Sequence, residues 1–377
     1  MRFLVVAGFA ESLLGFRAPL IAALQAHGFE VHVAAPGLSP AHPSFARLQA
    51  KGLTAHGFPM QRTGTNPVAD LGTLFALYRL MRSVHPDHFL AYTIKAVVYG
   101  SLAAKLAGVS RRFALITGLG QAFRLGDGPR TRLEAIATGL YRLSLASVHG
   151  VFFQNPDDEA LFRKEGVLRR GAVSHVVAGS GIDLAEFRLA PLPQGEVRFL
   201  LIARLLVGKG VRIYAEAARI VKALHPKVSF ALVGWIDENP DAIGAEELEE
   251  WIGSGIVDYL GRLEDVRPAI AASHVFVLPS FYREGTPRTA LEALAMGRPV
   301  ITTDAPGCRE TVDDGVNGYL LPVKSVDSLV RAALNFIEDH PLISSMGSRS
   351  RALAEEKYDV HKVNAAMLRG MGIECEG

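Results

Sequence analysis

The chain is poor in cysteine, which excludes the class of small proteins that disulfides hold together. Among its 377 residues only Cys308 and Cys375 are cysteines, and this usage favours a reducing compartment. The 12 histidines are scattered along the chain. None forms a His-x-x-x-His pair supported by cysteine or carboxylate, so the sequence predicts no metal site.

Long apolar runs and familiar phosphate-binding motifs are also missing. No stretch reaches the roughly eighteen uninterrupted apolar residues of a transmembrane helix. Glu11 and Arg17 interrupt the apolar N-terminus, so we interpret its first residues as a buried strand and not as a secretory signal. The loop from Gly8 to Arg17 contains a second glycine, Gly15, but neither a G-x-G-x-x-G nor a G-K-[ST] pattern. Because the sequence predicts neither a transmembrane helix nor a secretory signal, the protein is expected to be soluble or peripheral.

What the sequence has in quantity is apolar residues, which make up 49% of the chain, together with 37 glycines. At this length two domains are expected. Short apolar runs alternate with amphipathic stretches, which predicts an α/β fold with mostly parallel sheets. The expected strands are 3–7, 30–35, 88–92, 112–117, 150–154, 197–203, 228–233, 256–260, 274–279 and 298–303. The expected helices are 16–27, 68–84, 95–107, 131–147, 211–225, 245–254, 265–272, 287–296, 326–338, 341–356 and a last one at about 357–371.

One stretch breaks this alternation. The run Arg-Leu-Ala-Pro-Leu-Pro-Gln-Gly-Glu at 188–196 is the best linker in the chain. We therefore predict an N-terminal domain over 1–187 and a C-terminal domain over 188–356. Two doubly wound domains would leave a cleft lined by the carboxyl ends of both sheets.

Glu284 and Glu292 form the most informative pair in the sequence. The first lies in a loop after the expected strand 274–279, and the second lies within the helix that follows. Thr286 is predicted to cap this helix and Pro287 to occupy its first turn. Free backbone N–H groups at the helix N-terminus favour a phosphate there. A pair of glutamates on one helix is most often a solvated face, but two carboxylates beside an anion site suit a nucleotide-sugar.

Arg204 and Lys209 form a second constellation, in the loop between the expected strand 197–203 and helix 211–225. In isolation such a pair most often means surface charge. At the carboxyl end of a strand, however, Arg204 is suited to hold phosphate oxygens in a fork and Lys209 to add a compact charge. With two cations and a helix N-terminus, no metal is needed to neutralise a leaving nucleoside diphosphate.

The net charge of +2 hides an asymmetry. Residues 1–150 carry 15 Lys/Arg and 6 Asp/Glu, whereas the remainder carries 25 basic and 32 acidic residues. A basic half attracts phosphates of lipids, lipid diphosphates or nucleic acid. No nucleic-acid motif accompanies it, so lipid phosphate is the favoured partner; the alternative is that the asymmetry only fits one domain to the other.

Together these motifs resemble the retaining glycosyltransferases of family four, which have the GT-B fold. The matching elements are Glu284 to Glu292, the pair Arg204 and Lys209, and the segment 179–187, Gly-Ser-Gly-Ile-Asp-Leu-Ala-Glu-Phe. A narrower likeness, carried by 91–105, 112–120, 153–158 and 303–310, is to bacterial enzymes that add N-acetylhexosamine-type sugars to undecaprenyl-diphosphate-linked glycans. The resemblance covers nearly the whole chain and implies that residues 357–377 return as a helix to the N-terminal domain.

The resemblance implies a role for each matched position. Glu284 would contact the donor sugar and, with Arg204 and Lys209, serve the breaking of the bond to UDP. Glu292 would accept hydrogen bonds from the ribose. Further donor-side positions are Gly15, Gly261, Leu263, Gly285, Thr286, Pro287, Arg288 and Thr289, of which Pro287 has no N–H to offer. The acceptor side would include Lys95, Thr117, Gly118 and Gly120.

These roles predict a metal-independent hexosyltransferase that moves an N-acetylhexosamine or related hexose from UDP to a polyprenyl-diphosphate-linked or similar glycan acceptor in cell-surface glycan assembly. It would be cytoplasmic and peripherally associated with the inner face of a bacterial membrane, with an anionic membrane surface as partner and no nucleic acid. Two alternatives stay open: the same fold acting on a soluble acceptor, and a non-catalytic nucleotide-sugar-binding protein. Same-face attack is the expected retaining mechanism, because no residue stands out as the nucleophile of a double displacement.

Overall fold

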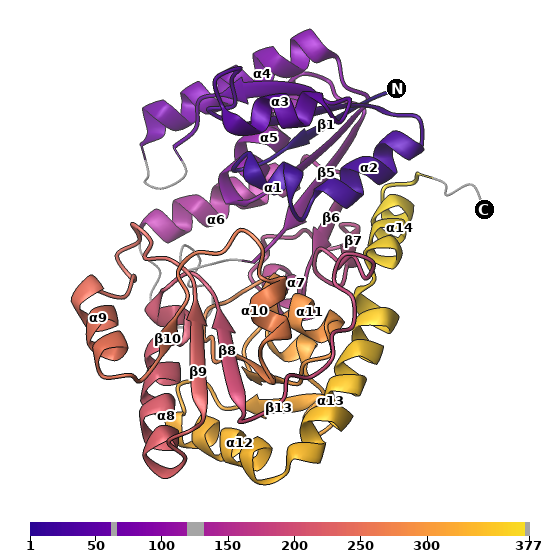
Figure 1. Ribbon diagram of the computed structural model, residues 1–377. Helices are drawn as coiled ribbons and strands as arrows, with labels where there is room; N and C mark the ends of the chain where they lie inside the picture. Colours follow the sequence, from indigo (N-terminus) through magenta and orange to yellow (C-terminus); the bar gives the residue numbers. More distant parts are fainter. Residues whose placement is uncertain (62–65, 119–131, 374–377) are drawn as a thin grey trace. The chain divides into compact units, whose positions relative to one another are not determined.

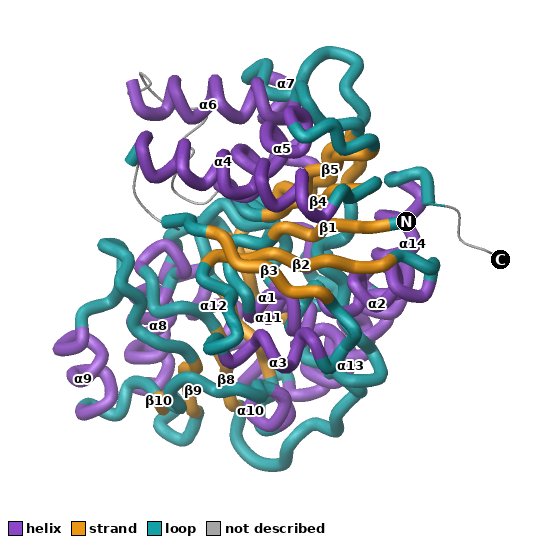
Figure 2. The backbone as a smooth tube through the Cα atoms, turned by 90° about the horizontal axis from the view of Figure 1, so that it is seen from above, coloured by secondary structure: helices purple, strands orange, loops and turns teal. Residues whose placement is uncertain are grey.

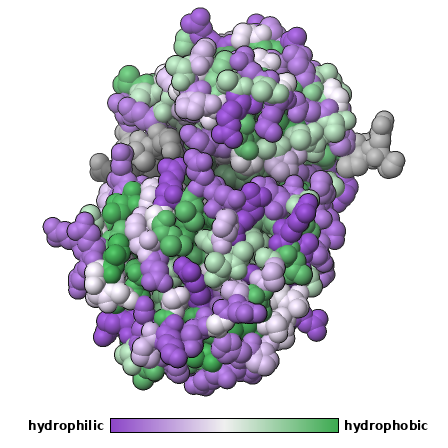
Figure 3. All heavy atoms as spheres, viewed as in Figure 1, coloured by the Kyte–Doolittle hydropathy of each residue, from purple (hydrophilic) through white to green (hydrophobic). Residues whose placement is uncertain are grey.

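The computed structural model describes residues 1–61, 66–118 and 132–373, and its chain divides into two compact units (Figure 1). Unit 1 comprises residues 1–181 and 360–377, and unit 2 comprises residues 182–359. Within the described ranges no helix combines the length and the apolar content needed to cross a membrane. In Figure 3 hydrophilic and hydrophobic residues are interspersed over the visible face of each unit.

Unit 1 is a parallel sheet of seven strands in the order β3-β2-β1-β4-β5-β6-β7. The strands are β1 (Arg2–Val6), β2 (Glu30–Pro36), β3 (Thr54–Phe58), β4 (His88–Tyr92), β5 (Arg111–Ile116), β6 (Gly150–Phe153) and β7 (Ser174–Val176). The helices are α1 (Glu11–Leu14), α2 (Ala18–Ala26), α3 (Pro43–Gln49), α4 (Pro67–Val84), α5 (Ile94–Leu106), α6 (Arg132–Leu145), α7 (Pro156–Lys164) and α14 (Val360–Gly370). The strand order reverses between β1 and β4.

The central strands of the unit 1 sheet are buried on both faces, which explains why β1, β4, β5 and β6 are runs of mostly apolar residues without polar alternation. Side chains from α4, α5, α6 and α7 form one core with residues such as Leu4 and Phe89. Side chains from α1, α2, α3 and α14 form the other core with Phe3 and Leu90. Figure 2 shows α4, α5 and α6 on one side of β1, β2 and β3, with α2 and α3 on the other.

Unit 2 repeats this plan with a parallel sheet of six strands in the order β10-β9-β8-β11-β12-β13. The strands are β8 (Arg198–Ile202), β9 (Ser229–Val233), β10 (Asp258–Tyr259), β11 (Val275–Leu278), β12 (Val300–Thr303) and β13 (Gly318–Leu321). The α-helices are α8 (Val211–Leu224), α9 (Ala245–Gly253), α10 (Arg267–Ala271), α11 (Arg288–Ala295), α12 (Val326–Glu338) and α13 (His340–Leu353). Two short 3-10 helices, η1 (Val207–Lys209) and η2 (Arg309–Thr311), and the π-helix η3 (Ala354–Tyr358) complete the unit.

The core of unit 2 lies against α8, α9, α12 and α13, where alternate strand residues such as Phe199 and Leu201 point. The residues between them, such as Leu200, are also buried, and α11 contacts β11 and β12. Helix α11 is buried all along Ala290 to Ala295. The strand order of this sheet reverses between β8 and β11, and right-handed crossovers then send the connecting helices to opposite faces.

The predicted alternation of strands and helices is confirmed in both units, although several short elements escaped it. Strands β3, β7 and β13 and helices α1, α3 and α7 have no counterpart among the expected segments. Most are short, and β3, with the sequence Thr-Ala-His-Gly-Phe, has only a buried Phe58 at its end. A strand with one fully buried residue has too little apolar signal to detect.

The division between the units differs from the predicted boundaries at 187 and 356. Ile182 donates its N–H to the Tyr358 carbonyl oxygen at 2.7 Å, and the Phe187 carbonyl accepts a hydrogen bond from Arg351 at 3.1 Å. These contacts attach 182–187 to unit 2, so the chain leaves unit 1 at Gly181 and returns to it at Val360. The predicted linker at 188–196 is also attached to unit 2, because the buried Arg298 side chain donates hydrogen bonds to the carbonyl oxygens of Ala190 and Pro191.

Candidate active site

Three predicted donor residues, Arg204, Lys209 and Glu284, lie at the switch point of unit 2, where β8 and β11 are neighbours and their following loops diverge. In open α/β sheets ligands bind at this place, beyond the carboxyl ends of the strands. Arg204 and Lys209 lie in the loop after β8, and Glu284 lies in the loop after β11. The sequence placed these residues on separate segments; the sheet order makes the two loops adjacent.

The two loops pack so closely that glycine is required. The Phe281 N–H donates to the Gly208 carbonyl oxygen at 3.0 Å. Gly210 has a φ of +77°, and a Cβ there would lie 2.1 Å from the Pro279 carbonyl oxygen. A side chain at 210 would therefore force the loops apart.

This packing brings Lys209 and Glu284 into an ion pair. The Lys209 Nζ lies 2.5 Å from Glu284 Oε2, with the two side chains 13% and 11% exposed. Ser280 donates its hydroxyl to the other carboxylate oxygen at 2.8 Å, and the Tyr282 ring centroid lies 5.6 Å from Nζ. A largely desolvated pair with a third polar partner has a fixed geometry, so both groups are held in place before any ligand arrives.

Arg204 has a different partner. Its Nη1 lies 2.9 Å from Asp237 Oδ2, and the two side chains are 37% and 23% exposed. The same segment supplies Asp241, whose carboxylate accepts the Gly208 N–H at 3.0 Å. Arg204 and Lys209 are thus each paired with a carboxylate in this structure. Neither Asp237 nor Asp241 was predicted, because no motif marks them; their segment becomes relevant only through its packing on the β8 loop.

A third loop, which follows β12, contacts the backbone of Glu284. Glu284 donates its N–H to the Pro306 carbonyl oxygen at 3.3 Å. Gly307 has a φ of +85°, and a Cβ there would lie 2.0 Å from the carbonyl oxygen of Gly285 and 2.5 Å from that of Glu284. The neighbouring Cys308 is buried, and burial raises the pKa of its thiol well above the ordinary value, which makes it a packing residue and not a nucleophile.

The start of α11 differs from the prediction by one residue. Pro287 is the residue before the helix, with extended backbone, and no side chain caps the N-terminus; the predicted cap at Thr286 is therefore wrong. A proline at this place is extended and cannot donate, so the helix starts at Arg288. Gly285, Thr286 and Pro287 are buried, whereas Arg288 and Thr289 are half-buried. In the first turn of a helix the N–H groups have no intrahelical acceptor, which leaves the amides of 288 and 289 suited to an anion.

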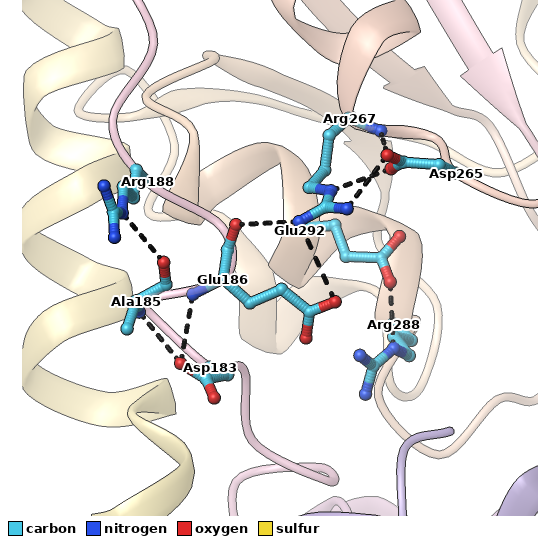
Figure 4. A network of polar contacts seen from close by, with 8 residues as sticks. All are labelled: Asp183, Ala185, Glu186, Arg188, Asp265, Arg267, Arg288 and Glu292. Carbon is cyan, nitrogen blue, oxygen red and sulfur yellow. Dashed lines mark hydrogen bonds and ion pairs between the residues drawn. The ribbon is translucent and has the colours of Figure 1, made fainter. Parts of the chain in front are cut away.

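Glu292 points back toward that N-terminus and pairs with Arg288, whose Nε lies 2.8 Å from Oε1 (Figure 4). Only 7% of Glu292 is exposed. Burial raises the pKa of its carboxyl above the ordinary value, Arg288 opposes this, and the charges of Glu186 and Asp265 add to the rise. A buried carboxylate with a raised pKa is a strong acceptor for a hydroxyl donor once it is ionised.

A network around Glu292 joins α11 to the segment that opens unit 2 (Figure 4). The Arg267 guanidinium makes two hydrogen bonds to the Asp265 carboxylate, at 2.8 and 2.9 Å, and its Nη1 lies 4.0 Å from Glu186 Oε1. The guanidinium carbons of Arg267 and Arg288 each lie 6.0 Å from the ring centroid of Phe187. None of these partners was predicted to act with Glu292.

The loop after β10 holds the two remaining donor positions of unit 2. Gly261 has a φ of +70°, and its carbonyl oxygen accepts the Gly234 N–H at 2.9 Å. Leu263 is half-buried two residues later. Because β10, β9 and β8 are parallel neighbours, this loop leaves the same edge of the sheet as the loop of Arg204.

The remaining predicted positions belong to unit 1 and lie apart in sequence. Lys95, in the first turn of α5, pairs with Asp70 at 2.8 Å. Thr117 and Gly118 directly follow β5, so they lie at the same sheet edge as the start of α5. Gly15 ends α1 and is exposed. Gly120 lies outside the described residues. Over the described ranges, no group of three or more His, Cys, Asp or Glu has an arrangement that could hold a metal.

Two doubly wound parallel sheets in one chain are the architecture of the GT-B class of glycosyltransferases. Residues 196–339 match the family described as "Glycosyl transferases group 1", and residues 6–155 match "Glycosyl transferase 4-like". The chain is 30% identical to the N,N'-diacetylbacillosaminyl-diphospho-undecaprenol alpha-1,3-N-acetylgalactosaminyltransferase of Campylobacter jejuni, over 88% of each chain. The chain therefore belongs to the group 1 glycosyltransferase family and is a glycosyltransferase.

Other relatives agree with this assignment. The UDP-Gal:alpha-D-GlcNAc-diphosphoundecaprenol alpha-1,3-galactosyltransferase of Escherichia coli is 25% identical over 75% of each chain. Among solved structures, the sucrose-phosphate synthase of Thermosynechococcus elongatus superposes with a TM-score of 0.80 at 17% identity, covering 98% of each chain. HepE of Anabaena, solved with UDP-glucose, superposes with a TM-score of 0.75 at 19% identity, covering 99% of each chain. These likenesses confirm the predicted GT-B fold.

Proposed function

We propose that the protein transfers a hexose or N-acetylhexosamine from UDP to a glycan carried on a polyprenyl diphosphate. The observation that carries the donor side is the cluster of Arg204, Lys209 and Glu284 at the unit 2 switch point. For the acceptor side, the support is that both curated relatives described above bear names that specify an undecaprenyl-diphosphate-linked acceptor.

In this proposal the two cations bind the diphosphate. The Lys209 Nζ lies 2.5 Å from Glu284 Oε2, and a small movement of the ammonium would let it bind an anion. Arg204 uses Nη1 for Asp237, which leaves further N–H groups of its fork for phosphate oxygens. Both charges would stabilise the leaving UDP, an electrostatic task that fixed groups perform well in a site that excludes water.

Glu284 is proposed to contact the hydroxyls of the donor sugar and to stabilise positive charge as the glycosidic bond breaks. The amides of Gly285, Thr286, Arg288 and Thr289 would hold sugar or phosphate at the start of α11, where Pro287 fixes the entry of the chain. Glu292 would accept the ribose hydroxyls, with Arg288 holding its carboxylate in place. Backbone groups of Gly261 and Leu263 would meet the base.

The acceptor is proposed to bind at the carboxyl edge of the unit 1 sheet, near Lys95, Thr117 and Gly118. Lys95 is largely buried and already paired with Asp70. Its ammonium has three donors, so a phosphate or hydroxyl oxygen of the acceptor could share it with Asp70.

The chemistry is proposed to retain the anomeric configuration. The bond between the anomeric carbon and the UDP oxygen breaks, and the acceptor oxygen bonds to the same face of that carbon. The acceptor's hydroxyl proton passes to the leaving phosphate oxygen, which balances the step without a protein nucleophile. The two glutamates do not act as a glycosidase pair, because the second is assigned to the ribose. Two cations and a helix N-terminus make a metal unnecessary for neutralising UDP.

The setting is proposed to be the inner face of a bacterial membrane, with the protein peripherally bound to anionic lipid from the cytoplasmic side. The polyprenyl acceptor requires access to a bilayer, and the excess of basic residues in 1–150 supplies the attraction.

Purified protein incubated with a panel of UDP-sugars tests the proposal, with product masses read by mass spectrometry. We expect UDP release that depends on a polyprenyl-diphosphate-linked sugar, and loss of UDP affinity in Arg204→Ala but not in Arg212→Ala, a control on an exposed arginine paired with Glu247. Turnover on a soluble acceptor alone would show the same fold serving another substrate. Tight UDP binding without turnover on any acceptor would make the protein a nucleotide-sugar-binding protein and refute the proposal.

A further inference from the structure

Helix α4 is held in unit 1 by its inner face alone. Leu77 and Met81 are 0% and 1% exposed. The Thr73 hydroxyl donates to the Pro59 carbonyl oxygen at 2.8 Å, and Asp70, on the same inner side, forms the ion pair with α5 described above. These contacts fix the helix at both its start and its middle, so its outer face is not needed for folding.

The outer face of α4 nevertheless carries large apolar side chains. Val68, Leu71 and Phe75 are 78%, 65% and 60% exposed. At about 100° per residue they lie within about 60° of one another around the helix axis. The outer face of an ordinary surface helix is polar, and single exposed apolar residues need no explanation. Three in a line over two turns form a patch that indicates a binding surface.

The charges that continue this stripe have one sign. Arg79 and Arg82 are exposed and fall on the same line, within about 80° of the apolar residues. The guanidinium carbon of Arg79 lies 5.8 Å from the ring centroid of Phe75. The acidic residue of α4, Asp70, lies on the opposite side and is engaged with Lys95. The outer face therefore joins an apolar end to a cationic end without a carboxylate between them.

We propose that this outer face docks unit 1 onto an anionic phospholipid surface. Val68, Leu71 and Phe75 would enter the interface between headgroups and acyl chains, and Arg79 and Arg82 would contact lipid phosphates. Apolar side chains with adjacent arginines on one helix face match this chemistry, whereas a helix that packs on a protein partner needs no excess of one charge. The inference rests on the proposed function for its setting, since it gives the predicted membrane association a place in the fold.

Sedimentation of the full-length protein with vesicles tests the proposal directly. We expect binding to vesicles that contain phosphatidylglycerol and weaker binding to phosphatidylcholine alone. The double variant Leu71→Ser/Phe75→Ser should bind the anionic vesicles at least about tenfold more weakly. The double variant Arg79→Gln/Arg82→Gln should lose about fivefold per arginine at low salt, and less as salt rises.

Two matched controls separate this face from general hydrophobicity and charge. Leu224→Ser removes an equally exposed leucine, 62% exposed, from α8 of unit 2. Arg169→Gln/Arg170→Gln removes the same charge from an exposed turn of unit 1. Both controls should bind vesicles as the wild type does. Circular dichroism melts should show all variants folded, because the substituted side chains make no buried contact.

The outcomes distinguish this proposal from the proposed function. The α4 variants should keep wild-type UDP affinity and wild-type turnover of a water-soluble acceptor with a shortened prenyl chain. Wild-type vesicle binding without turnover of any lipid-linked acceptor would refute the function and leave the docking face standing. Unchanged vesicle binding in the α4 variants would refute the docking face. So would sedimentation velocity showing that they convert a dimer to a monomer while vesicle binding persists.

Discussion

The two sheets share one winding scheme but carry different side chains at their switch points. In unit 2 the edge between β8 and β11 holds Lys209 and Glu284 in contact, with Arg204 on the same loop as Lys209. In unit 1 the edge between β1 and β4 is aromatic: buried Arg17 lies 5.1 Å from the ring centroid of Tyr92. The same scaffold thus holds a buried cation–carboxylate pair at this edge in one unit and a cation–π contact in the other.

The loops at these edges differ in the same way. Unit 2 uses glycines where backbones approach, as at Gly210 and Gly307. Unit 1 instead holds Thr93 at a φ of 72° and ψ of 149°, a region that non-glycine residues rarely occupy. Gly8 makes room for it, because a Cβ at position 8 would lie 2.3 Å from the Thr93 hydroxyl oxygen. We interpret unit 2 as the donor side and unit 1 as the acceptor side, and four substitutions test that contrast.

The largest effect is expected from Glu284→Gln, which keeps the shape of the side chain and removes its charge. Turnover should fall about a hundredfold or more, because charge that develops in the transition state loses its partner. UDP affinity should stay the same or rise, because Lys209 is released from its carboxylate. Steady-state kinetics and calorimetric UDP titration measure both, with exposed Glu264→Gln as control. Equal turnover would remove Glu284 from the mechanism.

The next effect is expected from Gly307→Ala, which places a Cβ against the backbone under Glu284. The displaced loop should lower kcat/KM about tenfold or more, since small misplacements of catalytic groups are costly. Gly315→Ala is the matched control: its φ is +73° and no atom lies within 4 Å of the added Cβ. Both substitutions place alanine at a positive φ, but only Gly307→Ala brings a Cβ against the backbone of another loop. An equal loss of activity in Gly315→Ala would show that backbone strain, and not the contact with the Glu284 loop, is responsible.

A smaller and more selective effect is expected from Lys95→Ala in unit 1. The KM for the lipid-linked acceptor should rise about tenfold, the scale of a lost charged hydrogen bond, while UDP affinity is unchanged. Lys105→Ala, exposed on the same helix, should leave both constants alone. If Lys95→Ala weakened UDP instead, the assignment of the two units to acceptor and donor would be reversed.

The smallest effect concerns stability and pH at Glu292. Its pKa is raised in the folded protein by burial, so the unfolded chain loses this proton first as pH rises. The carboxyl therefore contributes stability below its ordinary pKa of 4.5 and loses it as pH rises toward the raised value. Glu292→Gln should gain in Tm relative to the wild type between pH 4 and neutrality, about a few degrees. Parallel melting curves for the two proteins would refute the raised pKa.

Much of this fold is readable from the sequence because its strands are buried on both faces. Runs such as Phe-Leu-Leu-Ile in β8 are apolar without interruption, and they alternate with amphipathic helices such as α8 and α12. The positions of Glu284, Arg204 and Lys209 were predicted as well, because each lies in the loop that follows a strand. Whether each performs its assigned step is a prediction that the experiments above address.

The sequence alone could not show which residues contact Arg204 and Glu284. Asp237 meets Arg204 from 33 positions away, and Gly307 supports Glu284 from another loop. Such contacts depend on strand order, which a single sequence does not reveal. The exposed stripe on α4 could not be predicted either. Its apolar residues at 68, 71 and 75 have the spacing of a buried helix face, and only their exposed fractions in the structure show that they lie on the outer face.

The most direct test of the central claim is hydrogen–deuterium exchange of the full-length protein with and without UDP. UDP held by the unit 2 switch point should slow exchange most at the amides of 208–210, 285, 286, 288 and 289, which are proposed to face the diphosphate and sugar. Amides at 93–97 and 117–118 of unit 1 should change least. Slowing confined to these unit 1 segments, with the unit 2 loops unchanged, would contradict the account.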